Sequence, residues 1–205
     1  ATVPFHFLMQ SELSANPSRP MRGLDYRGLD LESGIRHMQL SGVRYYLAFS
    51  ADAVEEAGQY PDQLELIARS DPWRIYLVAN SELVEGLKFE PNVVAQGDLG
   101  GRDWTDPAMV WFNDRTQSQV TVTDGGPDNW HRININEPSF LGRTSFAEPL
   151  KNPLPALSVT NIFEEGDTIS FSVDQVGVPV LVKASYFPNW SVDGALGPYR
   201  ATPNW

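Results

Sequence analysis

Cysteine is absent from the 205-residue sequence. Its absence excludes a disulfide framework, a zinc site built from thiolates and a thiol nucleophile. The cellular compartment stays open, because exported bacterial domains can also do without cysteine.

Positive charge is scarce. Lys and Arg number 15 against 26 Asp and Glu, so the formal net charge is -11. Binding of nucleic acid needs clustered Lys and Arg, and anionic lipid attracts the same residues. The charge balance therefore disfavours both and favours a solvated acidic surface. We expect no nucleic-acid partner.

Long hydrophobic runs are also missing. No stretch of 18 consecutive apolar residues occurs, so we expect no segment of this sequence to span a bilayer. The opening residues ATVPFHFLMQSEL have an apolar patch but no basic leader or cleavage-like site, so they do not read as a signal peptide. The abrupt start is typical of a piece of a longer protein.

The common catalytic signatures are absent: the phosphate-binding loop, the dinucleotide fingerprint, the G-x-S-x-G elbow and the zinc motif H-E-x-x-H. His6, His37 and His131 stand far apart in unlike contexts. A histidine metal site or triad could still assemble in space; the alternative is solvent-facing or capping histidines. The neighbouring carboxylates Glu55/Glu56 and Glu164/Glu165 point apart on a strand or helix, which favours a solvated face over an acid–base pair.

Regular elements are nevertheless predicted along the chain. GVRYYLAFS, residues 42–50, is typical of a buried strand. The following ADAVEEAG predicts about two helical turns. QLELIARS and WRIYLVAN flank Ser70-Asp71-Pro72, which predicts a β-hairpin, with a helix over 61–69 as the competing interpretation.

Further short strands and one helix are predicted in the second half. Thr105 or Asp106 as N-cap, with Pro107 at the first helical position, predicts a helix start. Strands follow at 120–122 and 133–135, and ISFSV presents Ile169, Phe171 and Val173 as an inward face after a turn at EEGD. Pro179 lacks an amide donor and should open its strand or lie at an edge.

These patterns predict an α+β fold that is mainly β. We expect an extended N-terminal segment over 1–34 and a small α+β subdomain over 35–100. A C-terminal antiparallel β-sandwich of jelly-roll-like type should occupy 101–205, truncated at its C-terminus, with its strands from about Gln117 onward.

Calcium is one candidate ligand. TDGGPDNWHRININE offers the oxygen ligands of Asp124, Asp128 and Glu137 on a bent loop, which suits calcium. The spacing is not that of an EF-hand, and Asp-Gly and Pro-Asp are also ordinary turn residues. No other cofactor is expected.

Aromatic residues in loops are the better candidates for binding. Sugars stack on exposed aromatic rings while Asn and Asp bond their hydroxyls, so a carbohydrate-binding surface is a reasonable hypothesis. The alternative is that the rings pack over the ends of the sandwich. The candidate residues are Trp104, Trp130, Asn189, Trp190 and Tyr199.

VLVKASYFPNWSVDG, residues 180–194, combines a strand with such an aromatic tail. Val180, Val182, Ala184 and Tyr186 share one face of an alternating strand. We expect Pro188 to end its pairing, Trp190 to pack back over the sandwich end and Asp193-Gly194 to turn the chain. The tail is thus a structural corner first and a ligand platform second.

Several of these stretches together resemble a known family. GVRYYLAFS with WRIYLVANSELVEGLKFEPNVV, and ISFSVDQVGVPVLVKASYFPNWSVDG, resemble the extracytoplasmic region of YfhO-like proteins and related multi-spanning GT-C glycosyltransferase-like families. GLDYRGLDLESGIRHMQLSGVRYYLAF looks closest to actinobacterial members, some labelled 6-pyruvoyl-tetrahydropterin-synthase-related membrane domain, although no pterin motif occurs here. The resemblance covers 20–95 and 155–200, and departs at Asn189, where the family usually has glycine.

The resemblance implies a non-catalytic extracytoplasmic domain of a bacterial membrane protein linked to cell-envelope glycan assembly. Its partners would be a glycan or lipid-linked glycan and the membrane part of the same polypeptide, at the outer face of the cell membrane. The parent would be a GT-C-like glycosyltransferase. A secreted glycoside-active enzyme and a purely structural or protein-interaction domain are the alternatives.

Overall fold

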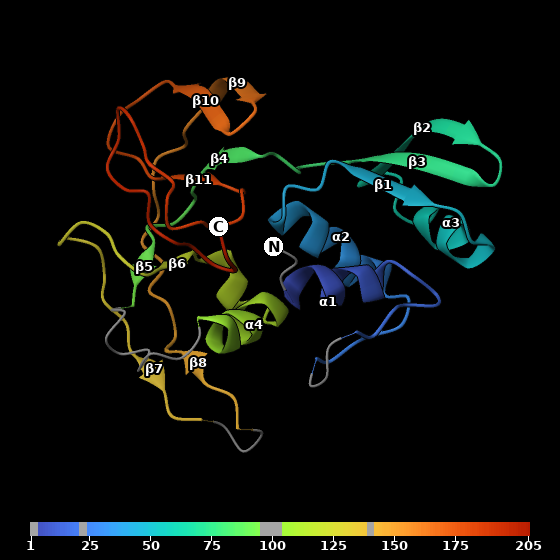
Figure 1. Ribbon diagram of the computed structural model, residues 1–205, viewed down its shortest axis with the longest axis horizontal. Helices are drawn as coiled ribbons and strands as arrows, with labels where there is room; N and C mark the ends of the chain where they lie inside the picture. Colours follow the sequence, from blue (N-terminus) through green and yellow to red (C-terminus); the bar gives the residue numbers. More distant parts are fainter. Residues whose placement is uncertain (1–3, 21–23, 95–103, 139–141) are drawn as a thin grey trace. The chain divides into compact units, whose positions relative to one another are not determined.

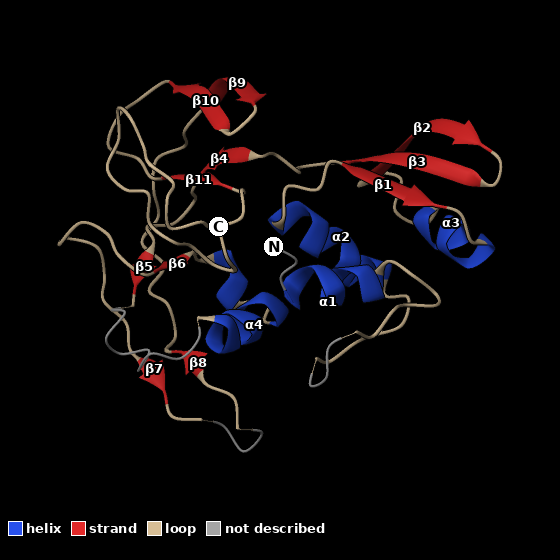
Figure 2. Ribbon diagram, in the orientation of Figure 1, coloured by secondary structure: helices blue, strands red, loops and turns tan. Residues whose placement is uncertain are grey.

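The chain forms two compact units, residues 1–83 and residues 84–205 (Figure 1). The computed structural model describes residues 4–20, 24–94, 104–138 and 142–205. The border at 83/84 differs from the expected borders at 34/35 and 100/101, because the first helices belong to the same core as the first sheet. Four α-helices and eleven strands are present in the described ranges, which confirms a mixed α+β fold that is mainly β (Figure 2).

Helices open the first unit. They are α1 (Pro4–Glu12), α2 (Leu31–Leu40) and α3 (Ala51–Ala57), and the last confirms the helix predicted from ADAVEEAG. Asp30 and Ser50 cap α2 and α3 by accepting the N–H of the third residue along. The extended segment expected over 1–34 is wrong for α1 and for the start of α2. In α1 the residues Phe5, Leu8 and Met9 recur at helical spacing and are buried.

A three-stranded antiparallel sheet completes the first unit. Its order is β1-β3-β2, with β1 at Tyr45–Ala48, β2 at Leu64–Ser70 and β3 at Trp73–Val78. The predicted hairpin is confirmed as β2–β3, with an irregularity in register between Leu66 and Ala68. The competing helix over 61–69 is not formed.

The core of the first unit lies on one face of this sheet. Tyr46, Ala48, Tyr76 and Val78 point to that face and pack with apolar side chains of the helices, which are Met9, Leu31, Ile35, Met38, Ala53 and Ala57. The strand predicted from GVRYYLAFS exists, but only alternate residues of β1 are buried. The expectation of a buried strand is therefore wrong for Tyr45 and Leu47.

Pairs of strands make up the second unit. β4 (Val84–Gly86) pairs with β11 (Val180–Val182), and β5 (Asn92–Val93) runs parallel to β6 (Val122–Thr123). β7 (Ile135–Asn136) pairs with β8 (Ser145–Phe146), and β9 (Val159–Glu165) with β10 (Thr168–Val173). The described strands thus form two-stranded sheets, and the expected jelly-roll-like sandwich is not found among them.

One helix, α4 (Thr105–Asn113), and a 3-10 turn, η2 (Gln117–Gln119), complete this unit. The N-cap is Trp104 rather than Thr105 or Asp106, and no side chain caps the helix. The Asp106 carboxylate accepts the N–H and hydroxyl of Thr144 instead, at 2.6 and 2.9 Å. No helix in the described residues is long and apolar enough to cross a membrane.

The hairpin β9–β10 turns at Gly166, whose φ of +62° suits glycine, as EEGD predicted. Phe171 and Val173 are 36% and 37% exposed, so the expectation that they face inward is wrong. Pro179 directly precedes β11, as predicted from its missing N–H, and its carbonyl accepts the N–H of Leu87. After β11, the ammonium of the buried Lys183 lies 3.0 Å from the carboxylate of Glu85.

Candidate functional site

Trp104 is a core residue of the second unit. Its side chain is 2% exposed, its indole N–H donates to the carbonyl of Pro203 at 2.8 Å, and its ring packs 5.6 Å from the ring of Phe146. No face of this ring is available for a sugar. The expectation that Trp104 binds carbohydrate is therefore replaced by a packing role at the start of α4.

Arg200 joins Trp104 to another ring. Its guanidinium carbon lies 5.1 Å from the centroid of Trp104 and 5.5 Å from that of Tyr186, distances typical of cation–π contacts. Two guanidinium nitrogens donate to the amide oxygen of Asn204, at 2.9 and 2.5 Å. Two bonds join its backbone to Asp124. The Asp124 N–H donates to the Arg200 carbonyl, and the Arg200 N–H donates to the Asp124 carboxylate. Arg200 is thus held from three sides.

Trp130 and Tyr199, by contrast, meet at the surface. Their ring centroids are 5.9 Å apart and the rings are inclined by 65°, an edge-to-face contact. Both side chains are half-buried, so each keeps part of its ring in solvent. Two of the predicted aromatic residues, distant in sequence, are thus brought together.

Two glycines support this pair. A Cβ on Gly126 would lie 2.3 Å from the Trp130 ring, and one on Gly125 would lie 3.1 Å from the Tyr199 ring. The rings therefore lie directly on the backbone of the Gly125-Gly126 loop, at a distance that only glycine permits at position 126.

Arg132 fixes the loop that carries Trp130. Its guanidinium donates to the carbonyls of Gly126, Pro127 and Trp130, at 3.2, 2.8 and 2.6 Å. Asp128 and Asn129 form the exposed tip between these anchors. We call residues 124–132 with Tyr199 the aromatic loop. It presents two fixed rings, with the exposed Asp128 carboxylate and Asn129 amide at its tip.

The calcium candidates do not converge in the described structure. Asp124 accepts the N–H of Arg200 at 2.9 Å, whereas Asp128 is fully exposed and lies 3.9 Å from Arg132. Glu137 is also exposed. No group of three or more metal-ligating side chains is found in the ranges that the structure describes.

Trp190 and Asn189 form a separate corner. The Trp190 backbone N–H donates to Phe187 at 2.9 Å, and its indole N–H donates to the Ser185 carbonyl at 3.1 Å. Asn189 is exposed and does not adopt the left-handed conformation. No ring contact among the described residues joins Trp190 to Trp130 or Tyr199. The predicted corner is wrong in part: the strand ends at Val182, before Ala184 and Tyr186, so Pro188 does not end its pairing, and the described residues form no sandwich end for Trp190 to cover.

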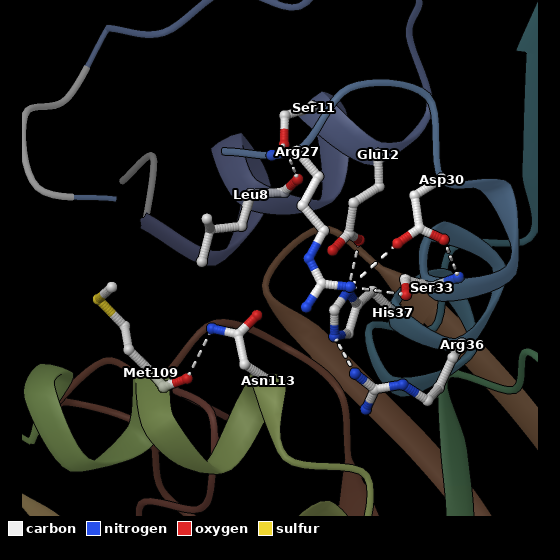
Figure 3. Close-up of polar contacts among 10 residues, drawn as sticks. All are labelled: Leu8, Ser11, Glu12, Arg27, Asp30, Ser33, Arg36, His37, Met109 and Asn113. Carbon is white, nitrogen blue, oxygen red and sulfur yellow. Dashed lines mark hydrogen bonds and ion pairs between the residues drawn. The ribbon is translucent and has the colours of Figure 1, made fainter. Parts of the chain in front are cut away.

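A buried polar cluster in the first unit was not predicted from the sequence (Figure 3). Nδ1 of His37 lies 2.5 Å from a carboxylate oxygen of Glu12, and Nε2 lies 2.5 Å from a guanidinium nitrogen of Arg36. Arginine can only donate, so Nε2 accepts and Nδ1 donates to Glu12. The alternatives of a solvent-facing or capping role are wrong for His37, whose side chain is 1% exposed. Only its position beside the apolar stripe of α2 could have signalled burial.

This cluster connects α1 to α2. Glu12 is 2% exposed, so neither it nor His37 can reach a substrate in this conformation. Arg27 also joins the two helices: its backbone N–H donates to the Ser11 hydroxyl of α1 at 3.3 Å, and its guanidinium donates to Asp30 at 3.0 Å and to Ser33 at 3.1 Å, at the start of α2 (Figure 3). Burial raises the pKa of Asp30, but the hydrogen bonds from Arg27 and Ser33 outweigh it and hold this pKa below its usual value. The cluster therefore stabilises the helix pair.

The remaining histidines lie apart from it. His6 is half-buried on α1, where burial lowers its pKa, and His131 is exposed.

In the second unit the amide of Asn113 donates to the carbonyl of Met109, a bond within α4 (Figure 3).

Comparisons with protein-family models, with curated proteins and with solved structures gave no match. The resemblance to YfhO-like proteins stays a prediction from the residues quoted for it.

Proposed function

We propose that this chain is a non-catalytic extracytoplasmic domain of a bacterial membrane protein linked to cell-envelope glycan assembly, and that it binds carbohydrate at the aromatic loop. The observation that carries the proposal is the contact between Trp130 and Tyr199 over two glycines. Rings held in this way lose little conformational freedom when a ligand stacks on them.

The chemistry around the rings suits a sugar. The half-exposed rings of Trp130 and Tyr199 offer apolar area to sugar C–H groups, while Asp128 and Asn129 offer an acceptor and a donor to hydroxyls. The surface is small, so we expect weak binding, with a dissociation constant of about 1 mM for a short oligosaccharide.

A glycosidase is the second candidate and is less well supported. It needs two carboxyl groups about 5 Å or about 6.5–9.5 Å apart across a cleft. The groove of about 470 Å³ between α3 and β2 is lined mainly by apolar residues and contains a single carboxylate, Glu65. The proposal therefore assigns no catalytic residue to this chain. Any glycosyl transfer would be carried out by the membrane part of a GT-C-like parent.

Titration of the chain with arabinan, galactan and mannan oligosaccharides, followed by NMR or calorimetry, tests the carbohydrate site. We expect Trp130→Ala to weaken binding about tenfold, because half of the stacking surface is lost. Trp190→Ala is the matched control, since Trp190 is also half-buried but belongs to the other corner.

The outcomes separate the hypotheses. If only Trp190→Ala lost carbohydrate binding, the binding site would lie at the YFPNW corner. Release of sugar from any glycoside would favour the enzyme, and absence of both binding and hydrolysis would leave a structural or protein-interaction domain. The reading frame of the parent gene tests the topology: the proposal requires hydrophobic segments of ~20 residues outside this chain.

A further inference from the structure

The first unit has an apolar sheet face that the core does not use. Residues of β1 that alternate with the buried Tyr46 and Ala48 point to it, and the antiparallel register aligns Tyr45 with Leu77 and Leu47 with Ile75. One position further, the rings of Phe49 and Trp73 are 5.1 Å apart. We call this set the outer face: Tyr45, Leu47, Phe49, Trp73, Ile75 and Leu77.

The outer face is contiguous and exposed. Tyr45, Leu47, Phe49 and Trp73 are 49%, 53%, 59% and 44% exposed, and Ile67 on the neighbouring strand is 47% exposed. Antiparallel sheets usually pair one core face with a polar face. An apolar face in its place is typical of an interaction surface.

The size of the outer face limits what can cover it. Its four most exposed side chains, Tyr45, Leu47, Phe49 and Trp73, are each about half exposed and so offer roughly 400 Å² of accessible surface, at about 200 Å² for a large side chain. A stable protein–protein contact buries about 800 Å² on each partner. A second copy or a folded partner would therefore need much more surface than this face offers, whereas a lipid bilayer needs none beyond the side chains that enter it.

We infer that the outer face is a docking surface for the interface of a zwitterionic lipid bilayer. Trp and Tyr, which stand at two corners of the face, are the residues enriched at membrane–water interfaces. Arg44 lies over the Tyr45 ring, with 5.7 Å from guanidinium carbon to centroid, so its charge can remain at headgroup level while its stem follows the ring.

Charge around the outer face is mixed. Glu65 is aligned with Leu77 across β2 and β3, Asp71 at the hairpin tip pairs with Arg74 at 2.8 Å, and Arg44 lies beside Tyr45. Among the described residues, the face therefore carries no cluster of free cations that would favour anionic lipid, and the net charge of -11 on the chain repels it. A quaternary ammonium headgroup also suits the exposed rings through cation–π contact.

A sugar fits this face less well than it fits the aromatic loop. The rings of Phe49 and Trp73 are inclined by 43°, so they form no common plane, and the side chains beside them are Leu47 and Ile75, which cannot bond a hydroxyl. The docking surface lies in the first unit and the proposed carbohydrate site in the second, so neither proposal depends on the other.

Flotation of the full chain with phosphatidylcholine vesicles tests the docking surface. We expect wild-type protein to partition onto these vesicles, and less onto vesicles that contain phosphatidylglycerol. The double variant Phe49→Ser, Trp73→Ser should lose at least about tenfold in partition, because two exposed rings no longer leave water. Phe163→Ser, which removes a 66% exposed ring of β9, is the matched control and should bind like wild type.

Three results would overturn the inference: no partition of the wild-type chain, unchanged partition of the double variant, or equal loss in Phe163→Ser. Sedimentation of the wild type as a dimer that the double variant abolishes would assign the face to a second copy instead. The melting temperature and circular dichroism of each variant establish that it is folded. Trp130→Ala should float like wild type, which separates this test from that of the carbohydrate site.

Discussion

Asp30 begins α2 and carries a charge that the folded chain stabilises. Its carboxylate accepts from the N–H of Ser33 and from Arg27, and its folded pKa is lowered from the ordinary value of 3.8. A lowered folded pKa means that the stabilisation is complete above about pH 4 and is lost as the pH falls through the folded value.

Replacement of Asp30 by alanine should therefore lower the free energy of unfolding by about 1 kcal/mol at neutral pH, the usual value of an N-cap. The loss should shrink as the pH falls below 4, because the wild type then loses the same charge. Urea unfolding of both proteins between pH 3 and 7 measures this, with Asp30→Asn as the control that keeps a capping oxygen. A pH-independent difference would contradict the role of the charge.

Tyr46 has a raised pKa, so the stability that it contributes is lost at high pH rather than at low pH. Burial, then Tyr76 and Glu56, raise its pKa to about 12, and its hydroxyl donates to the carbonyl of Leu13 at 3.0 Å. The stabilisation is complete below the unfolded pKa of about 10 and is lost as the pH rises through 12.

We expect one tyrosine of the folded chain to ionise about two pH units later than the exposed tyrosines in an absorbance titration. Tyr46→Phe should remove that late step and lower the free energy of unfolding by about 1 kcal/mol, since the Leu13 carbonyl loses its donor. A late step that survives in Tyr46→Phe would mean that another tyrosine carries it.

Gly126 decides whether the aromatic loop keeps its shape. A methyl group there would overlap the Trp130 ring, so Gly126→Ala must move either the ring or the backbone. We expect a destabilisation of about 1–3 kcal/mol and a shifted fluorescence maximum. The control is Gly28→Ala, where the added Cβ meets nothing and φ is not in the left-handed region; it should leave the fluorescence unchanged.

At the scale of elements, an ion pair joins β4 to the residue that follows β11. Lys183 has a side chain 2% exposed, while Glu85 is 39% exposed. Glu85→Ala removes the carboxylate that contacts Lys183. We expect the free energy of unfolding to fall by about 1–3 kcal/mol, less than for a fully buried pair because Glu85 is partly exposed. Lys183→Met should cost less, because an apolar side chain of similar volume needs no partner. The reverse order in thermal unfolding would contradict this reading of the pair.

Elements with local signals could be predicted from the sequence. The β2–β3 hairpin follows from turn chemistry at Ser70-Asp71-Pro72, and α3 from its alanines and glutamates. The helix α1 was missed because it is short, and Pro and Gly downstream obscure the period. Phe171 and Val173 alternate as an inward face would, but the local pattern could not show which elements cover them.

The candidate site depended on contacts that no local pattern contains. Aromatic residues in loops were singled out as candidates, yet the sequence does not distinguish Trp104, which packs on Phe146, from Trp130, which packs on Tyr199. Glu12 and His37 meet only because α1 folds onto α2. Such pairings are set by tertiary packing, so they become visible only in the folded chain.

At the scale of the whole molecule, two compact units imply two cores. Ile35 is fully buried in the first and Phe146 in the second. We expect calorimetry of the full chain to resolve two unfolding transitions. Ile35→Ala should lower the free energy of unfolding of the first unit by about 2–5 kcal/mol. Phe146→Ala should lower that of the second unit by about 3–5 kcal/mol. A single transition that both variants shift equally would mean that the units unfold together.

The pairing of β4 with β11 also has a consequence for synthesis. Lys183 leaves the ribosome 98 residues after Glu85, which at about 10 residues per second is a delay of roughly 10 s. Residues 1–83 can close their core early in that interval, whereas the nascent second unit must wait with Val84 and its neighbours uncovered. Chaperones that bind emerging chains should therefore contact the second unit longer than the first.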